Sequence, residues 1–235
     1  MASNVPARCC TVGVKHSGEA NGEYQEIDGA EMYFSYPKDR STKHGVILLT
    51  DVIGHRFINS QLIADQFAAN GYLVAMPDLF HGDPVKLNRP ATFNLMSWLE
   101  GHPVDRVDPV VDSVIQYMRT QLGCKRIGAV GYCFGAKYVV RFLRPEEGKF
   151  DAGFIAHPGF VELEELCAIT GPLSIAAAEG ILRDLGQPYQ INLYSGVEHG
   201  FAIRADLTDK AKKFSKEQAF LQAVHWFDEF IKSGN

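Results

Sequence analysis

Apolar runs alternate with amphipathic stretches along most of this chain. Three continuous apolar runs, at 45–50, 72–76 and 126–131, are typical of strands that are buried on both faces of a sheet. Three further segments are predicted as strands: 150–156, 172–178 and 190–194. Residues 32–36, which Pro37 follows, are predicted as an early antiparallel strand at the sheet edge. Residues 1–28 show little periodicity and are predicted as a loop-like lead-in.

Helical spacing of apolar residues fills the gaps between these strands. The predicted helices are 60–68, 91–100, 108–122, 136–143 and 217–231. Buried strands that alternate with helices predict an α/β fold, with a mostly parallel central sheet and helices on both faces. Ligands of such sheets bind at the carboxyl ends of the strands, so the loops there are the ones to examine for chemistry.

Length and composition are those of one ordinary globular domain. The chain has 235 residues, of which 46% are hydrophobic and 22% charged, so we predict one domain over residues 1–235. The net charge of −5 argues against nucleic acid as a partner. No apolar run approaches the roughly 18 residues of a transmembrane helix, and residues 1–8 lack the apolar middle of a secretory signal. We therefore expect a cytoplasmic location and no membrane partner. The sequence does not indicate whether the protein forms oligomers.

The chain has an odd number of cysteines, and they are spread over its length. They are Cys9, Cys10, Cys124, Cys133 and Cys167, without the spacing of a metal site. Adjacent Cys9 and Cys10 near the amino terminus could serve redox or metal chemistry, but we interpret them as incidental. No motif implies a metal or an organic cofactor.

One cysteine lies in a motif with a specific mechanical meaning. Cys133 follows the predicted strand 126–131 within Gly131-Tyr132-Cys133-Phe134-Gly135. This is the pattern of a nucleophile elbow, a sharp strand-to-helix turn, with Cys in the Ser position. The turn leaves no room for side chains two residues before or after the nucleophile, and the helix that follows favours a thiolate. A buried structural cysteine in an ordinary turn is the alternative that this motif alone does not exclude.

His199 follows the last predicted strand, where α/β-hydrolases carry the base of their triad. With the elbow upstream, we predict that His199 is the base for Cys133, and a loop residue that caps the strand end is the alternative. The backbone N–H groups of Phe134 and Val52 are predicted to form an oxyanion hole, because such folds use the residue after the nucleophile and one from an earlier loop. The alternative for the Val52 loop is a plain strand-to-helix turn.

Four segments together resemble the dienelactone hydrolase (carboxymethylenebutenolidase) family in its fungal form. They occur in order across nearly the whole chain: 50–54 (TDVIG), 77–80 (PDLF), 131–135 (GYCFG) and 198–202 (EHGFA). The resemblance implies an α/β-hydrolase fold and a Cys-His-Asp triad that hydrolyses small esters or lactones. It also implies that Asp51 stands where an acidic residue helps to hold the resting thiol. Substrate contacts are implied for Asp51, for Arg204, which lies near one of two family arginines, and for His81, which replaces the other.

The triad acid is where the chain departs from the family pattern. The family places an Asp two residues after a stretch like 176–179, in a loop that a full helix follows, but Ile181 occupies that position. The loop and the first helical turns are therefore predicted to be deleted. Only nine residues separate Glu179 from Tyr189, fewer than a parallel crossover usually needs. Glu179 is predicted as the substitute acid because it adjoins the strand end, and Asp184 is the alternative.

These residues predict a cysteine-dependent hydrolase that acts on a small ester or lactone through a thioester. Three alternatives remain open: a relative that only binds a small molecule in the same cleft, a glutaminase-like amidotransferase, and an incomplete sequence whose parent has a normal triad. Amidotransferases of that class carry Glu two residues after the histidine, where this chain has Phe201. Five aromatic residues could line an apolar pocket or belong to the core: Phe80, Tyr132, Phe134, Phe160 and Phe201.

Overall fold

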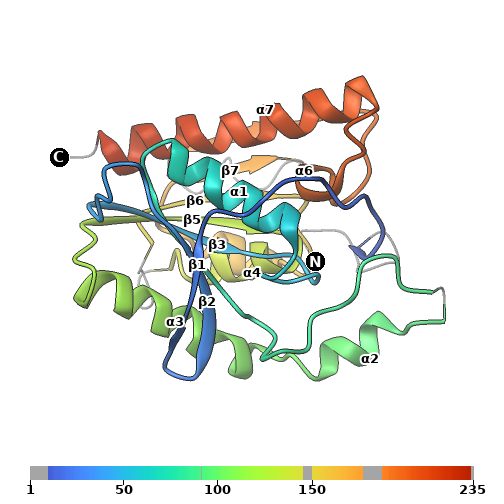
Figure 1. Ribbon diagram of the computed structural model, residues 1–235, viewed down its shortest axis with the longest axis horizontal. Helices are drawn as coiled ribbons and strands as arrows, with labels where there is room; N and C mark the ends of the chain where they lie inside the picture. Colours follow the sequence, from blue (N-terminus) through green and yellow to red (C-terminus); the bar gives the residue numbers. More distant parts are fainter. Residues whose placement is uncertain (1–9, 91, 145–149, 177–186, 234–235) are drawn as a thin grey trace.

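A mixed sheet forms the centre of the computed structural model, which describes residues 10–90, 92–144, 150–176 and 187–233 (Figure 1). The strands of this described part are Glu23–Ile27 (β1), Ala30–Ser35 (β2), His44–Leu49 (β3), Leu73–Pro77 (β4), Arg126–Tyr132 (β5), Ala152–Ala156 (β6), Leu173–Ala176 (β7) and Tyr189–Asn192 (β8). Their order across the sheet is β1-β2-β4-β3-β5-β6-β7-β8. The six strands from β4 to β8 in this order pair in parallel, which confirms the predicted fold class.

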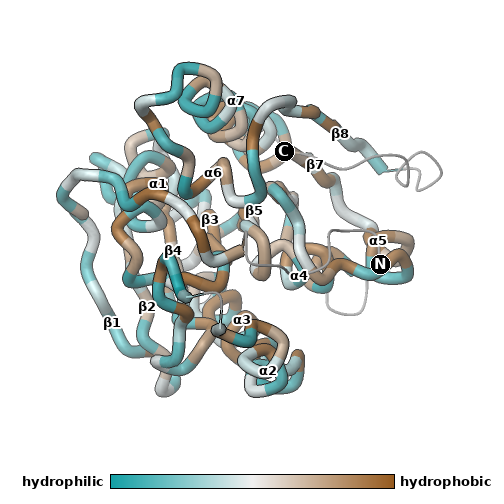
Figure 2. Tube along the Cα trace, turned by 90° about the vertical axis from the view of Figure 1, so that its right-hand side faces the viewer, coloured by the Kyte–Doolittle hydropathy of each residue, from teal (hydrophilic) through white to brown (hydrophobic). Residues whose placement is uncertain are grey.

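The antiparallel end of the sheet corrects two expectations. Residues 23–27, predicted as part of a loop-like lead-in, form β1 and pair antiparallel with β2. Strand β2, predicted at the sheet edge, therefore lies between β1 and β4. The side chains of β1 are exposed or half-buried along the whole strand, and Figure 2 shows β1 in largely polar colours. A strand with no buried face carries no alternation that a sequence pattern can reveal.

The longer helices fall where the sequence predicts them, although the last one begins at Lys210, seven residues before the predicted start at 217. The helices are Ile58–Ala69 (α1), Leu95–Glu100 (α2), Val104–Thr120 (α3), Phe134–Arg141 (α4), Leu163–Cys167 (α5), Phe201–Arg204 (α6) and Lys210–Phe227 (α7), which a π-helical turn over Asp228–Lys232 (η3) continues. The sequence pattern does not predict α5 and α6, because four or five residues are too few to show a helical period. Within the described residues, no helix is long and apolar enough to cross a bilayer.

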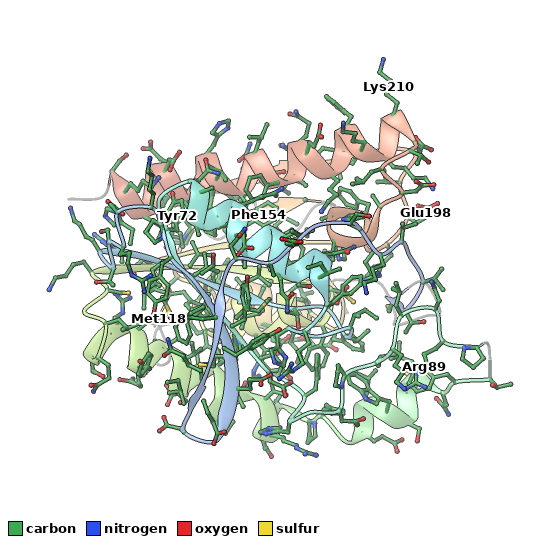
Figure 3. The ribbon with its side chains drawn as sticks, viewed as in Figure 1. Tyr72, Arg89, Met118, Phe154, Glu198 and Lys210 are labelled. Atoms are coloured by element: carbon green, nitrogen blue, oxygen red, sulfur yellow. The ribbon has the colours of Figure 1, made fainter. Side chains whose placement is uncertain are left out.

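Helices cover both faces of the sheet. Helices α1 and α7 lie on one face, and α3 and α4 lie on the other (Figures 1 and 2). The sheet interior is fully apolar at its centre, where every residue of β4 and β6 is buried. Phe154 of β6 marks this core in Figure 3, and Tyr72 and Met118 lie toward the amino ends of the parallel strands, away from Glu198.

The carboxyl ends of the parallel strands meet at one end of the molecule. The loop after β3 holds Asp51 and Val52, the turn after β5 holds Cys133, and the loop after β8 holds His199. The amino-terminal segment 10–14 packs at the same end, where Val14 N–H donates to the carbonyl of Arg204 in α6. The fold thus gathers the predicted chemistry in one place.

Candidate active site

Cys133 occupies a strained turn between β5 and α4. Its backbone angles are φ 50° and ψ −105°, a conformation that L-residues rarely adopt. A Cβ atom on Gly131 would lie 2.7 Å from the Cα of Ala136, and one on Gly135 would overlap the carbonyl of Leu49 in β3. Both glycines are therefore required by close backbone approach, as the elbow motif predicts.

The thiol of Cys133 faces His199. The Sγ atom lies 3.0 Å from Nε2 of His199, although the two residues are 66 positions apart in the sequence. Cys133 is fully buried, whereas His199 is half-buried. This contact places the imidazole where a general base must be to take the thiol proton.

A second thiol lies in the same place. Cys10 Sγ lies 3.5 Å from Nε2 of His199, and the ligand atoms of Cys10, Cys133 and His199 all lie within 4.8 Å of one another. Both cysteines are buried, and neither forms a disulfide. The interpretation of Cys10 as incidental was therefore wrong. The sequence could not show its contact with His199, because residues 189 positions apart share no local spacing pattern.

The segment that carries Cys10 is tied down on both sides. Asn88 N–H donates to the carbonyl of Thr11 at 2.7 Å, and the Asn88 side chain accepts from Gly13 N–H at 3.1 Å. Asn59 Nδ2 donates to the carbonyl of Val14 at 2.9 Å. These bonds hold the amino-terminal segment over the thiol of Cys133.

Beneath the site, Asp51 and Arg204 form a buried ion pair. The guanidinium Nη1 of Arg204 donates to Oδ2 of Asp51, and both side chains are excluded from solvent. Arg204 Nε also donates to the carbonyl of Val12 at 3.3 Å. The pair joins the loop after β3 to α6 and to the amino-terminal segment. A substrate carboxylate would therefore have to compete with Asp51 for Arg204.

Of the two predicted oxyanion-hole residues, Val52 lies in a loop that several hydrogen bonds fix, and Phe134 is the first residue of α4. Ile53 N–H donates to Oδ1 of Asp51 at 3.0 Å, and Val85 N–H donates to the carbonyl of Val52 at 2.8 Å. Gly135 N–H donates to the carbonyl of Thr50 at 3.0 Å, which joins this loop to the elbow. The N–H groups of Val52 and Phe134 have no hydrogen-bond partner among the described residues.

The surroundings of Cys133 shift the pKa of its thiol in two opposite directions. The hydrogen bond with Cys10 and complete burial raise the pKa of the Cys133 thiol well above its ordinary value, and the negative charge of Asp51 adds to this. The guanidinium of Arg204 acts in the opposite direction and lowers the same pKa. The Cys133 thiol is therefore protonated at rest, and its conversion to a thiolate needs a base such as the adjacent imidazole.

His157 is a site residue that the sequence did not reveal. It follows β6 with φ 39°, is buried, and neither of its ring nitrogens has a hydrogen-bond partner within the described residues. Its ring packs edge-on against His199 with 4.9 Å between centroids. Burial lowers the pKa of His157 well below its ordinary value, and the nearby His199, Arg204 and Lys216 add to this effect. The imidazole beside His199 is therefore neutral.

Three aromatic side chains form one apolar cluster next to the elbow. The ring of Phe134 lies 5.1 Å from that of Phe80 and 5.9 Å from that of Phe160, and Trp98 extends the cluster at 5.1 Å from Phe80. Tyr132 and Phe201 instead pack on the ring of His157.

His81, the third predicted substrate contact, is not brought to the thiol. It is exposed with φ 50° and lines a cavity of about 460 Å³ together with Glu31, His55 and Asp78. Neither Cys133 nor His199 lines that cavity. The positive φ and exposure of His81 mark it as a turn residue after β4.

A different cavity reaches His199. It measures about 540 Å³ and is lined by residues of the amino-terminal segment, Val12 to Val14, and by Glu198, His199 and Arg204 among others. Figure 3 shows Glu198 at this end of the molecule.

The residues predicted as the triad acid cannot be placed in this site. Glu179 and Asp184 both lie outside the described residues. Among the residues that the structure does describe, no carboxylate forms a hydrogen bond or ion pair with His199.

Comparisons with known proteins agree on one family. The sequence model described as "Dienelactone hydrolase family" matches residues 31–181. The hydrolase pyvD of Aspergillus violaceofuscus is 49% identical over 99% of this chain and 100% of that protein. Dienlactone hydrolase 1 of Gibberella moniliformis is 32% identical over 95% of this chain and 93% of that protein. A crystal structure of a putative dienelactone hydrolase from Klebsiella pneumoniae superposes with a TM-score of 0.71 at 16% identity, over 91% of this chain and 100% of that chain, which shows a common fold.

Proposed function

Because this chain belongs to the dienelactone hydrolase family, we propose that it hydrolyses a small ester or lactone with Cys133 as its nucleophile. The observation that carries the proposal is the contact of 3.0 Å between Sγ of Cys133 and Nε2 of His199 at the tip of a strained elbow. A buried structural cysteine needs neither the strained backbone nor the imidazole.

The reaction proceeds in two halves on this geometry. His199 Nε2 takes the proton of the Cys133 thiol, and the thiolate attacks the carbonyl carbon of the substrate. The negative oxygen that forms is held by the N–H groups of Phe134 and Val52. Collapse of this intermediate breaks the C–O bond of the ester, and His199 returns the proton to the leaving alcohol. Water activated by His199 then releases the acid from the thioester.

Asp51 and Arg204 have a different role from the substrate contacts that the family resemblance implies. Each neutralises the other in a site without solvent, and the two charges shift the pKa of the Cys133 thiol in opposite directions. The aromatic cluster of Phe80, Phe134 and Phe160 next to the elbow favours an apolar acyl group. We therefore propose an uncharged ester or lactone as the substrate.

Glu179 remains our candidate for the acid behind His199. The alignment with pyvD spans 246 positions against 235 residues here, which leaves at least 11 positions of that relative without a counterpart and agrees with a deletion somewhere in this chain. If Glu179 orients His199, Glu179→Gln lowers kcat, whereas Asp184→Asn does not. The expected loss is smaller than the about 10⁴-fold loss in serine triads, since a Cys–His pair can ionise by itself.

The decisive experiment traps the acyl group on the thiol. The reduced protein is mixed with an activated aryl ester and quenched in acid, and intact-mass and peptide mass spectrometry locate the adduct on Cys133. Cys133→Ala loses at least about 10⁴-fold in kcat. Cys124→Ala is the matched control, because this buried cysteine lies two residues before β5, at the end of the strand opposite to the site. Turnover that persists in Cys133→Ala contradicts the proposal, and a wild type without adduct or turnover identifies a protein that only binds its ligand.

A further inference from the structure

Cys10, Cys133 and His199 bring two sulfur atoms and one nitrogen atom into a single buried cluster. Their ligand atoms lie within 4.8 Å of one another, and hydrolysis needs only two of them. We propose that these three residues bind a soft divalent cation, with Zn²⁺ as the best fit, and that the bound ion blocks the nucleophile.

The distances agree with a tetrahedral site. Zn–S bonds of about 2.3 Å and Zn–N bonds of about 2.0 Å place S and N about 3.6 Å apart across a tetrahedral centre. The structure has 3.5 Å between Cys10 Sγ and His199 Nε2 and 3.0 Å between Cys133 Sγ and the same nitrogen. One contact already matches, and the other needs a shift of about half an ångström.

The donor set determines the class of ion. Two thiolates and an imidazole suit Zn²⁺ and other soft or borderline ions, whereas Mg²⁺ and Ca²⁺ require oxygen ligands. Three protein ligands leave the fourth position of a tetrahedral ion for water. On binding, the two thiols release their protons to solvent, and no atom changes its oxidation state.

The surroundings position the ligands and admit an ion. The bonds of Asn88 to Thr11 and Gly13 fix the segment that carries Cys10. The ring of His199 packs against that of His157, which limits its rotation. The cavity of about 540 Å³ opens on His199 from the side of Val12 and Gly13 and provides the route of entry. Such supporting contacts are what a metal site requires beyond its ligands.

Binding and catalysis exclude each other in this arrangement. The lone pair of His199 Nε2 and the sulfur of Cys133 that would hold the ion are the same atoms that accept the proton and attack the carbonyl. Metal binding stands by itself, while its inhibitory effect rests on the proposed function. Cys10 thereby distinguishes this site from an ordinary Cys–His pair.

The test of binding does not use activity. The reduced full-length protein is titrated with Zn²⁺ by calorimetry and with Co²⁺ by its sulfur charge-transfer absorption, with Mg²⁺ and Ca²⁺ as competitors. We expect one ion per chain, no competition, and at least about 100-fold weaker binding in Cys10→Ser and in Cys10→Ala. Cys167→Ser, at an exposed cysteine, and Cys9→Ser, at the neighbouring position, retain wild-type affinity. Equal affinity in wild type and both Cys10 variants, with circular dichroism confirming folded protein, overturns the proposal, as does a loss in Cys9→Ser alone.

The test of inhibition compares each variant with itself. Hydrolysis of an activated ester by the wild type falls as Zn²⁺ rises, and a chelator restores it. In Cys10→Ser the concentration of Zn²⁺ for half inhibition rises by the same factor as the dissociation constant. Hydrolysis that continues in the zinc-bound protein overturns the blocking effect. A protein that binds Zn²⁺ through Cys10 but hydrolyses no ester retains the metal site and refutes the proposed function instead.

Discussion

The two residues of the proposed catalytic pair are held in place by different kinds of structure. Cys133 lies in the nucleophile half, which consists of β3, β5 and α4, and His199 lies in the histidine half, which consists of β7, β8 and α6. Strands β3 and β5 pair over six residues and are almost entirely buried. Strand β8 has four residues, none of them buried, and Leu193 directly after it is 62% exposed.

Polar contacts replace apolar packing in the histidine half. Gln222 of α7 donates to Ser174 of β7 at 2.9 Å and accepts from the hydroxyl of Tyr194 at 3.1 Å. The Asp51–Arg204 pair then joins this half to the nucleophile half. Backbone sterics thus determine where the thiol lies, whereas individual side-chain contacts determine where the imidazole lies. The nucleophile half should therefore be intolerant of added atoms, and the histidine half sensitive to lost contacts.

The largest effect is expected when one methyl group is added to the nucleophile half. In Gly135→Ala the new Cβ would overlap the carbonyl of Leu49, which is backbone within β3 and has no room to move. We expect a loss of at least about 4 kcal/mol in the free energy of unfolding, measured by urea denaturation, together with loss of turnover.

The matched control lies in the histidine half. Gly196 also follows a strand and has φ 74°, but nothing lies within 4 Å of a Cβ placed there. Gly196→Ala should therefore cost only about 1–2 kcal/mol, the strain of a left-handed backbone. Equal losses at Gly135 and Gly196 would contradict the idea that steric fit is concentrated at the elbow.

The next effect is expected at the contact between the halves. Arg204→Met leaves the buried carboxylate of Asp51 without its cation, which should cost about 3–5 kcal/mol. The double variant Asp51→Asn with Arg204→Met removes both charges and should recover part of that loss. Urea denaturation of the two single variants and the double variant gives the coupling energy.

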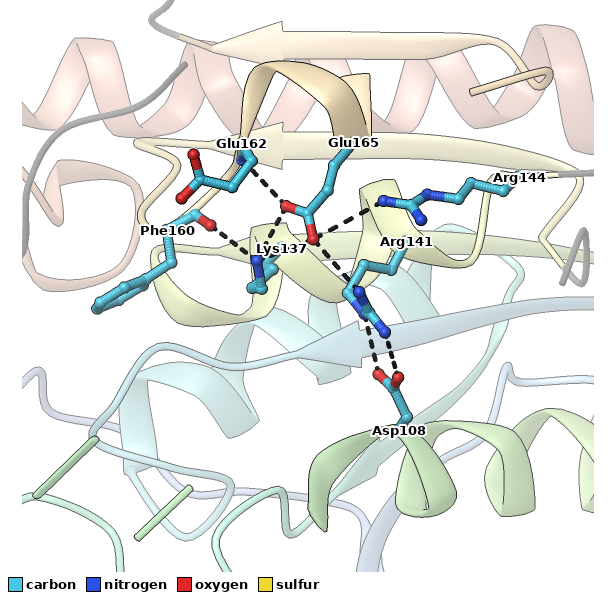
Figure 4. A network of polar contacts seen from close by, with 7 residues as sticks. All are labelled: Asp108, Lys137, Arg141, Arg144, Phe160, Glu162 and Glu165. Atoms are coloured by element: carbon cyan, nitrogen blue, oxygen red, sulfur yellow. Dashed lines mark hydrogen bonds and ion pairs between the residues drawn. The ribbon is translucent and has the colours of Figure 1, made fainter. Parts of the chain in front are cut away.

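A second ion network serves as the control for this prediction. Figure 4 shows Glu165 contacting Lys137, Arg141 and Arg144, while Arg141 also reaches Asp108. Because Glu165 keeps other cations and Asp108 is partly exposed, Arg141→Met should cost about 1–2 kcal/mol. A loss as large as that of Arg204→Met would contradict the special role of the Asp51–Arg204 pair.

The same contrast explains what the sequence could and could not predict. The continuous apolar runs of β3, β4 and β5 and the glycines around Cys133 are local patterns, and the structure confirms the strands and the close approach that requires those glycines. The contact of Cys10 with His199 and the pair of Asp51 with Arg204 join residues 189 and 153 positions apart. No local period records such contacts. Strand β1 escaped prediction for a related reason, since it has no buried face.

The smallest effect concerns His157, which packs against His199, the proposed base. Because burial holds the pKa of His157 well below its ordinary value, the unfolded chain binds a proton at a higher pH than the folded protein does. The contribution of His157 to the free energy of unfolding follows from this difference. That contribution is therefore highest above a pH of about 6.5 and decreases as the pH falls toward the lowered pKa. His157→Phe keeps an aromatic ring against Tyr132 but removes the titrating group.

Urea denaturation at pH 7.5 and pH 5.5 measures the difference. At pH 7.5 the variant should match the wild type within about 1 kcal/mol, because the imidazole has no hydrogen-bond partner among the described residues. At pH 5.5 it should be the more stable protein, by up to about 1.4 kcal/mol for one pH unit below 6.5. A variant that loses stability on acidification as steeply as the wild type would show that His157 binds its proton over the same pH range in the folded protein as in the unfolded chain. The positive charge beside His199 would then oppose formation of the imidazolium, and the histidine half would hold its base against that repulsion.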